Sequence, residues 1–240
     1  MLIYGINPVI EALKAGRVRE VRADAALRDR VREVKALADA QRVPVRLVST
    51  VELERAARGG VHQGVVAEIV QAPDYGVHDL LASADGPPLL VVLDGVEDPH
   101  NVGAILRTVD AAGAHGLVRQ TRHAARLDGA AAKASAGAVA HVKVANVVNI
   151  SRAITELKEA GVWTVGLDAG AREAYDEVDF TQPSALVVGA EGQGLRRLVR
   201  ESCDRLASIP MRGRVSSLNV SVAAAIVLFE AVRQRRAHGR

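Results

Sequence analysis

Residues 215–230 read Val-Ser-Ser-Leu-Asn-Val-Ser-Val-Ala-Ala-Ala-Ile-Val-Leu-Phe-Glu, and this stretch says most about the fold of the C-terminal half. Its two serines near the start are typical of a helix N-cap. The run that follows is apolar almost all round, which predicts a buried helix. Asn219 and Ser221 fall in its first turns, where a buried amide or hydroxyl needs a hydrogen-bond partner. This polar cluster indicates a site, although a cap and a tied-down loop explain the segment equally well.

Two further segments share a strand–loop–helix pattern and add polar motifs of their own. Residues 94–108 follow the apolar run Leu89–Leu93, and residues 186–195 contain a second apolar strand with a glycine-rich loop. With the first segment they give three spaced patterns. Asn-x-x-Ala-x-x-Arg is formed by Asn101, Ala104 and Arg107, Gly-x-Glu-Gly-x-Gly by Gly189, Glu191, Gly192 and Gly194, and Ser-Leu-Asn-Val-Ser by residues 217–221.

The three patterns, in this order, resemble the motifs of the SpoU branch of the SPOUT RNA methyltransferases. Residues 3–9 and 62–65 are similar to the small N-terminal domain of the 23S rRNA guanosine 2'-O-methyltransferases, so the resemblance covers nearly the whole chain. It implies an enzyme that uses S-adenosylmethionine to methylate a guanosine ribose of 23S ribosomal RNA. It also implies a homodimer, and a C-terminal trefoil knot whose threaded loops form the cofactor pocket. General rules of chain topology would not predict such threading.

The resemblance also assigns roles to individual residues. The implied catalytic residues are Arg107, Asn101, Glu191, Ser217 and Asn219, and the backbone at Gly189, Ile209 and Leu218 is implied to hold the adenosine part of the cofactor. Because arginine stays protonated, we expect Arg107 to align the ribose hydroxyl and stabilise the developing oxyanion. The alternative for Arg107 is a surface ion pair with Asp98 or Asp110.

Two other functions fit the same resemblance. A tRNA 2'-O-methyltransferase is disfavoured by the N-terminal domain, because the simplest tRNA enzymes of this branch lack that type of domain. A non-catalytic RNA-binding factor for ribosome assembly is disfavoured because no motif residue is missing. Nucleotide-binding classes fit less well, since the dinucleotide fingerprint would need glycine where Glu191 stands and the P-loop pattern is absent. Histidines show no paired metal-ligand spacing, so we expect no metal.

Composition indicates a globular protein with a sizeable core. The chain has 240 residues, of which 49% are hydrophobic, so disorder is not expected. The single cysteine, Cys203, excludes a disulfide framework and a thiolate zinc cluster. The N-terminus does not have the pattern of a signal peptide, and the longest apolar run, Val222–Phe229, is too short to span a bilayer. We therefore expect a cytoplasmic protein without a membrane segment.

Positive charge is concentrated in the two ends of the chain, where it could bind a polyanion. Formal charge is +3 over residues 1–70, −6 over 71–189 and +6 over 190–240. We expect Arg55, Arg58 and His62, which lie near one loop, to contact RNA, as well as Arg196 beside the suspected site. A polar turn or a solvated basic surface is the competing interpretation. Aromatic residues make up only 2% of the chain, which argues against recognition by base stacking.

The order of predicted elements indicates an α/β protein of two domains: a small α/β domain at 1–70, a linker rich in proline and glycine at 71–88, and a domain at 89–240. In the first domain we expect a helix that starts at Asn7-Pro8, another at 28–41, and a capping box at 49–52. For the second we expect a mostly parallel sheet with helices on both faces. Its predicted strands are 89–94, 116–119, 141–145, 162–167, 184–188 and 205–209, and its predicted helices about 101–112, 127–137, 150–160, 194–203 and 217–236.

Overall fold

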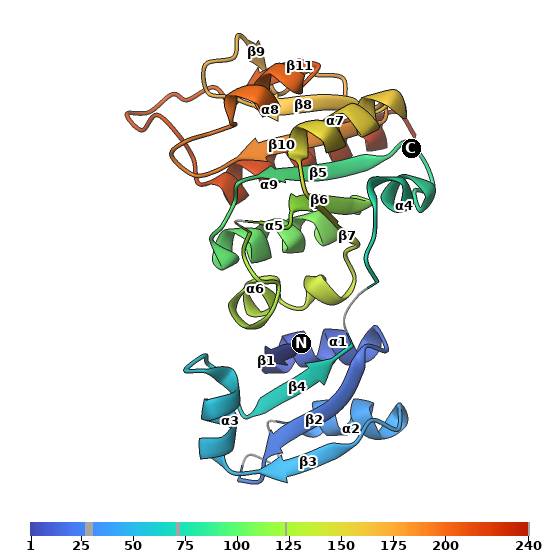
Figure 1. The fold of residues 1–240 in the computed structure, drawn as a ribbon, viewed down its shortest axis with the longest axis vertical. Helices are drawn as coiled ribbons and strands as arrows, with labels where there is room; N and C mark the ends of the chain where they lie inside the picture. Colours follow the sequence, from blue (N-terminus) through green and yellow to red (C-terminus); the bar gives the residue numbers. More distant parts are fainter. Residues whose placement is uncertain (27–30, 71–72, 123, 240) are drawn as a thin grey trace. The chain divides into compact units, whose positions relative to one another are not determined.

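The computed structural model describes residues 1–26, 31–70, 73–122 and 124–239, and these fall into two compact units (Figure 1). The first unit consists of Met1–Pro73, Val102–Arg107 and Ala125–His141. The second consists of Asp74–Asn101, Thr108–Ala124 and Val142–Arg240. Each unit is mixed α/β, which confirms the predicted fold class.

The first unit is built on a four-stranded sheet. Its order is β1 (Leu2–Tyr4), β4 (Val65–Ile69), β2 (Val18–Asp24) and β3 (Val45–Val48), with β2 and β3 parallel and the other pairs antiparallel. Helix α3 (Thr50–Ala57) buries Leu53 and Ala57 against Val48 and Val66. Ser49 is its N-cap and accepts a hydrogen bond from the Glu52 backbone N–H at 3.3 Å. The N-cap at Ser49 is therefore confirmed, but among the described residues the return bond of a capping box, from the Ser49 N–H to the Glu52 side chain, is not seen, and Glu52 pairs with Arg46 instead.

The predicted start of the first helix is wrong. Helix α1 (Ile6–Lys14) begins before Asn7, with Gly5 as N-cap at φ 99°, a backbone conformation that glycine adopts without steric cost. The Ile6 N–H donates to Gln63 Oε1 at 3.1 Å. Pro8 lies within the first turn, where its missing N–H leaves no helical bond unmade. The next helix, α2, spans Arg32–Ala40, and residues 28–30 of the predicted helix 28–41 lie outside the described residues.

Residues 125–141 pack with the N-terminal sheet within the first unit. The single helix predicted over 127–137 is instead helix α6 (Gly129–Ala134) followed by a 3-10 turn, η1 (Ala138–Ala140). Gly137 separates them in a left-handed conformation, with φ 100°. Arg17 donates to the carbonyls of Val139 and Ala140 at 3.2 and 3.0 Å. A fragment without residues 1–70 would lose these contacts, so experiments on this protein are best made with the full chain.

The second unit contains a seven-stranded sheet in which all pairings are parallel, where a mostly parallel sheet was predicted. The strand order is β7 (Val144–Val147), β6 (Gly116–Gln120), β5 (Leu89–Asp94), β10 (Ser184–Gly189), β8 (Trp163–Leu167), β11 (Arg205–Ser208) and β9 (Glu173–Ala174). The short strand β9 was not predicted, and β7 begins later than the predicted strand 141–145.

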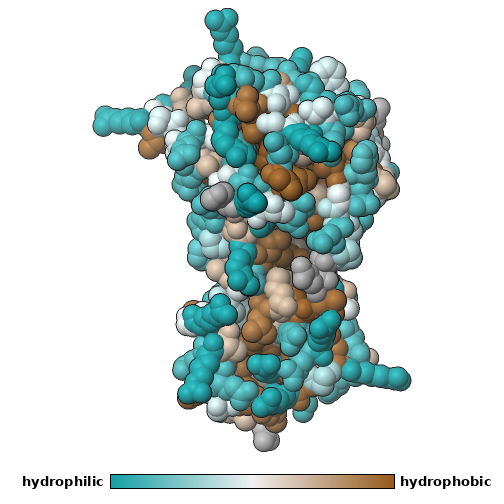
Figure 2. Space-filling model, in the orientation of Figure 1, coloured by the Kyte–Doolittle hydropathy of each residue, from teal (hydrophilic) through white to brown (hydrophobic). Residues whose placement is uncertain are grey.

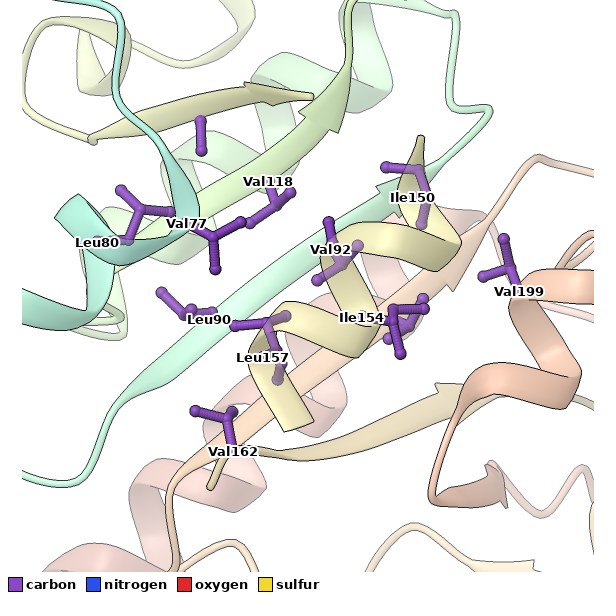
Figure 3. Close-up of a cluster of buried hydrophobic side chains, with 14 residues drawn as sticks. Val77, Leu80, Leu90, Val92, Val118, Ile150, Ile154, Leu157, Val162 and Val199 are labelled. Atoms are coloured by element: carbon purple, nitrogen blue, oxygen red, sulfur yellow. The ribbon is translucent and has the colours of Figure 1, made fainter. Parts of the chain in front are cut away.

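Three helices cover one face of this sheet, and their buried side chains pack with those of the strands in one core cluster (Figure 3). They are α4 (Val77–Ala82), α7 (Ile150–Glu159) and α8 (Arg197–Ser202). Helix α4 lies inside the stretch predicted as a linker, yet Val77 and Leu80 are buried in the core cluster. Residues 71–72 of that stretch lie outside the described residues. The composition of 71–88 therefore hides a helix that belongs to the second unit.

Helix α9 (Val220–Ala237) packs against β10 but differs from the predicted buried helix in two ways. It begins at Val220 with Asn219 as N-cap, so the two serines expected to cap it precede the helix. It is also buried on one side only, because Val222 and Phe229 are 46% and 50% exposed. An apolar sequence alone does not show whether a helix is covered by its own chain.

The surface of the molecule is largely hydrophilic on the face drawn in Figure 2, with separate apolar patches. Within the described ranges, no helix has the length and apolar character needed to cross a membrane.

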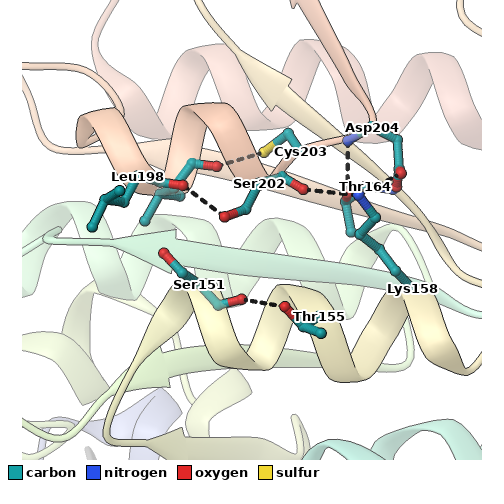
Figure 4. Close-up of polar contacts among 9 residues, drawn as sticks. Ser151, Thr155, Lys158, Thr164, Leu198, Ser202, Cys203 and Asp204 are labelled. Atoms are coloured by element: carbon teal, nitrogen blue, oxygen red, sulfur yellow. Dashed lines mark hydrogen bonds and ion pairs between the residues drawn. The ribbon is translucent and has the colours of Figure 1, made fainter.

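A polar network around the buried Thr164 fixes strand β11 beside β8 (Figure 4). Asp204 Oδ2 accepts from the Thr164 N–H at 2.9 Å and from the Thr164 hydroxyl at 2.7 Å, and Lys158 Nζ lies 2.8 Å from Asp204 Oδ1. Burial opposes ionisation of Asp204, but the hydrogen bonds from Lys158 and Thr164 outweigh it and lower its pKa. Burial raises the pKa of the neighbouring Cys203 thiol to about 12, so this cysteine stays protonated and has a packing role.

We predict that Asp204→Ala lowers the free energy of unfolding by about 2 kcal/mol near neutral pH, because charge-assisted hydrogen bonds are lost. The pKa of Asp204 is lower in the folded protein than its ordinary value of 3.8. Its contribution is therefore complete above that value and is lost as pH falls through the folded-state pKa. Denaturant unfolding at several pH values measures this. Equal destabilisation in acid and at neutral pH would contradict the ionic origin of the effect.

Candidate active site

The order of strands places a site at the carboxyl ends of β5 and β10. From β5 the chain continues through β6 and β7 toward one edge of the sheet, whereas β8, β11 and β9 lie on the side of β10. Asp94 and Gly189, the last residues of the two central strands, are paired in register. Loops that leave such a point diverge, and the crevice between them is where parallel α/β sheets bind ligands. The loops concerned are 95–98 and 190–196.

The glycine-rich loop after β10 has a shape that only glycine permits at its base. A Cβ atom at Gly189 would lie 2.1 Å from the Gly194 carbonyl carbon and 2.4 Å from the Leu195 nitrogen. The loop therefore folds back directly over Gly189. It is closed by a hydrogen bond from the Gly194 N–H to the Ala190 carbonyl at 2.8 Å. Gly192 and Gly194 have φ values of 76° and 68°, which glycine adopts readily.

The three sequence motifs meet in one chain of hydrogen bonds. Asn101 lies in the first turn of helix α5 (Pro99–Ala111) and is 7% exposed. Its Nδ2 donates to Glu191 Oε2 at 3.1 Å, and its Oδ1 accepts from Asn219 Nδ2 at 2.9 Å. Asn219 Oδ1 in turn accepts from the Ser221 N–H at 2.9 Å and caps α9. The structure thus brings together Asn101, Glu191 and Asn219, three of the predicted catalytic residues.

The other two predicted catalytic residues lie outside this network. Ser217 is exposed in the segment before α9. Arg107 is exposed on α5, and within the described part of the chain it has no hydrogen-bond or ion-pair partner. The alternative role, an ion pair with Asp98 or Asp110, is therefore not formed. Its guanidinium is therefore available to a ligand. Of the residues predicted to hold the cofactor, Gly189 is buried and Ile209 and Leu218 are half-buried, at either end of the connection between β11 and α9.

The residues predicted to contact RNA in the first unit lie at the end of α3 and in the loop that leads to β4. Arg55 is in the last turn of α3, and Arg58 is its C-cap, in a left-handed conformation with φ 49°. Both are exposed. His62 Nδ1 accepts from the Gly64 N–H at 3.1 Å, so part of this ring is committed to shaping the loop.

Two charged residues at the carboxyl edge of the large sheet were not predicted. Asp94 is fully buried and holds Arg196, the fourth residue expected to contact RNA. A carboxylate that ends an otherwise apolar strand is the sequence signal that could have revealed it. Arg119 in β6 is 8% exposed, and among the described residues its Nε and Nη1 have no partner. Burial lowers the pKa of Arg119. A desolvated cation at this edge favours an anionic ligand nearby.

Within the described ranges, no group of three or more histidine, cysteine, aspartate or glutamate side chains is arranged to hold a metal ion. The candidate site consists instead of the amides of Asn101 and Asn219, the carboxylate of Glu191 and the backbone of the glycine-rich loop.

Comparison with known proteins agrees with this geometry. Residues 88–229 match the model of the SpoU rRNA methylase family, and residues 2–75 match that of the RNA 2'-O ribose methyltransferase substrate-binding domain. The chain is 42% identical to the 23S rRNA (guanosine-2'-O-)-methyltransferase RlmB of Bordetella pertussis, over 98% of each protein. It is 43% identical to an uncharacterized tRNA/rRNA methyltransferase of Mycolicibacterium gilvum, over 98% of this chain and 77% of that protein.

Among solved structures, the chain is similar to the SpoU methyltransferase AviRb from Streptomyces viridochromogenes. The crystal structure of AviRb alone has a TM-score of 0.85 at 31% identity and covers 99% of this chain and 90% of AviRb. The structure of AviRb in complex with the cofactor AdoMet has a TM-score of 0.83.

We predict that Gly189→Ala lowers stability by about 1–3 kcal/mol, several degrees in Tm, because the new methyl group overlaps the backbone of residues 194–195. Gly213→Ala is the matched control, since no atom lies within 4 Å of a Cβ placed there. Thermal unfolding of both variants measures the difference. A Gly189→Ala protein as stable as the control would show that the loop does not close over this residue.

Proposed function

Because the chain belongs to the SpoU rRNA methylase family, we propose that it transfers a methyl group from S-adenosylmethionine to the ribose 2'-oxygen of a guanosine in 23S rRNA. The observation that carries the proposal is the Glu191–Asn101–Asn219 network, which joins all three motifs at the switch point of the sheet. RlmB of Bordetella pertussis, by its name, acts on this class of nucleotide. Methylation of tRNA is the second candidate, because the Mycolicibacterium relative is named for both RNAs.

The residues present fit the cofactor. A Cβ placed at Gly192 or Gly194 would meet no atom within 4 Å, so the backbone of the loop is open to a ligand at these two positions, whereas the space beside Gly189 is taken by the backbone of residues 194–195. Together with the backbone at Ile209 and Leu218, the N–H and C=O groups of this loop would hold the adenosine moiety. When bound, S-adenosylmethionine supplies the activated methyl group. No metal is required for this chemistry.

The side chains of the site have the task of positioning and activating a weakly acidic hydroxyl. We assign to Arg107 the alignment of the 2'-oxygen and the stabilisation of its developing negative charge, because its guanidinium is exposed and unpaired within the described residues. Asn101 and Glu191 fix the local geometry, and Asn219 ties both to α9. Ser217, in the exposed segment beside them, is assigned a contact with the substrate.

Recognition of RNA is assigned to the N-terminal residues. Residues 2–75 match a substrate-binding domain, and Arg55 and Arg58 are exposed there with no part in the catalytic network. We assign residues 1–70 to RNA binding and 89–240 to catalysis; of the stretch 71–88 between them, helix α4 belongs to the second unit. A protein that modifies 23S rRNA acts where ribosomes are assembled, so the cytoplasmic location expected from the sequence belongs to the same proposal.

A homodimer is also part of the proposal, as is the knotted C-terminal topology implied by the resemblance. The support for the dimer is the exposed side of α9. Phe229 is 50% exposed and lines, with Val232, Arg233, Arg236 and Ala237, a groove of about 420 Å³. An apolar helix side next to a groove is a surface that a second subunit would cover.

Arg107→Ala should lower the methylation rate on 23S rRNA by about 100- to 1,000-fold, the typical effect of removing one donor to a developing oxyanion. Binding of S-adenosylmethionine, measured by calorimetry, should be nearly unchanged. Arg152→Ala is the control, since this arginine is an exposed residue of α7 that pairs with Glu156. Ribose methylation mapped on purified 23S rRNA and on tRNA gives the rate and the substrate together. Normal turnover by the Arg107 variant, or methylation of tRNA alone, would refute the assignment concerned.

Phe229→Glu should convert the dimer into a monomer, because it places a charge in the proposed interface. Val148→Glu serves as the control, since Val148 is 84% exposed in the short connection between β7 and α7, away from α9 in the sequence. Light scattering of the folded variants gives the mass. A monomeric unmodified protein, or a dimeric Phe229 variant, would exclude this surface as the interface.

A further inference from the structure

A buried ion pair holds the end of the glycine-rich loop. Asp94, the last residue of β5, has a fully buried side chain. Its Oδ2 accepts from the Arg196 backbone N–H at 2.8 Å, and its Oδ1 accepts from Arg196 Nε at 2.6 Å. Arg196 Nη2 is also paired with Oδ1. A carboxylate inside a protein is costly unless such partners neutralise it, so Arg196 is its necessary counterion.

The same guanidinium reaches a second strand. Arg196 Nη2 donates to Gln120 Oε1 at 2.9 Å, and Gln120 is the last residue of β6. Arg196 is also the N-cap residue of α8. One residue therefore connects the carboxyl ends of β5 and β6 with the point where the loop becomes a helix. A planar guanidinium can make these bonds at once, whereas the compact ammonium group of lysine cannot.

The Asp94–Arg196 pair lies where it can hold both ends of the glycine-rich loop. The loop 190–195 is flanked by Gly189, which is paired with Asp94 in the sheet, and by Arg196, which is hydrogen-bonded to the same Asp94. Both ends of the loop are thus fixed to one residue. The loop carries Glu191, the partner of Asn101, and Asp94 itself begins the connection that leads to Asn101. The pair therefore sets the distance between two of the three motifs.

We propose that Arg196 is a positioning residue that, through Asp94 and Gln120, holds the glycine-rich loop in the shape needed by the cofactor and by Glu191. This role replaces the RNA contact expected from the sequence. The positioning role rests on the proposed function for the identity of the ligand that the loop binds. The conformation of the loop itself does not depend on that function. The Arg196 side chain is 56% exposed, so the test also measures RNA binding.

Three full-length variants test the proposal. Arg196→Gln removes the charge, Arg196→Lys keeps the charge and removes the planar fork, and Arg197→Gln is the matched control. Arg197 is the next residue along the chain, and its side chain is 80% exposed and pairs with Glu201 on the same helix. Calorimetry gives the affinity for S-adenosylmethionine, hydrogen exchange the order of loop 190–195, and filter binding the RNA affinity at several salt concentrations.

Both Arg196 variants should bind S-adenosylmethionine about tenfold or more weakly and methylate about 100-fold more slowly, because the reacting groups are misplaced. Hydrogen exchange should rise in loop 190–195. RNA affinity and its salt dependence should equal those of the Arg197 control. If Arg196 instead contacts a phosphate, Arg196→Gln will lower the salt slope by about one and leave cofactor binding intact, as Arg55→Gln is expected to do; that result overturns the proposal.

Failure of the two proposals can be told apart. If the unmodified protein methylates no RNA while both Arg196 variants loosen the loop, the proposed function fails and the positioning role stands. If the unmodified protein is active and the Arg196 variants keep cofactor affinity and loop order, the positioning role fails alone. Should Arg196→Gln not fold, Arg196→Lys decides, because it retains a cation beside Asp94.

Discussion

The site depends on the buried side-chain amide of Asn101. A buried amide has one acceptor and one donor group to satisfy, and in this protein both partners come from distant parts of the sequence, Glu191 and Asn219. Leaving either group unpaired would cost about 1–3 kcal/mol. The hydrogen bonds therefore form only when β5, β10 and α9 are assembled, and they make the integrity of the site part of the stability of the fold.

Other features of the second unit hold Asn101, Glu191 and Asn219 in place. The parallel order of strands brings the carboxyl ends of β5 and β10 side by side. Gly189 allows the following loop to fold back over the strand end, and Asp94 with Arg196 fixes the far end of that loop. Asp204 and Thr164 hold β11 next to β8, which sets the start of the connection toward α9. Arg107 is left exposed on α5, where it can meet a substrate.

Much of the fold and of the site was predictable from sequence, for identifiable reasons. Buried parallel strands are short continuous apolar runs, so β5 and β10 were predicted almost to the residue. The start of α9 was not, because Ser216, Ser217 and Asn219 are all good caps and only the partner Asn101 selects among them. Helix α4 was missed because its two buried side chains lie among polar and glycine residues. The exposed side of α9 was missed because its sequence resembles a core helix. A carboxylate at the end of an apolar strand marks Asp94, but its partner Arg196 is distant in sequence and no local pattern reveals it.

Mapping ribose methylation in a strain from which the gene has been deleted tests the proposed activity most directly. The 23S rRNA of this strain should lack one 2'-O-methylguanosine. A plasmid copy of the unmodified gene should restore it, whereas a copy encoding Asn101→Ala should not, because the junction of the three motifs is broken. An unchanged methylation pattern of 23S rRNA after deletion, or a loss confined to tRNA, would contradict the account.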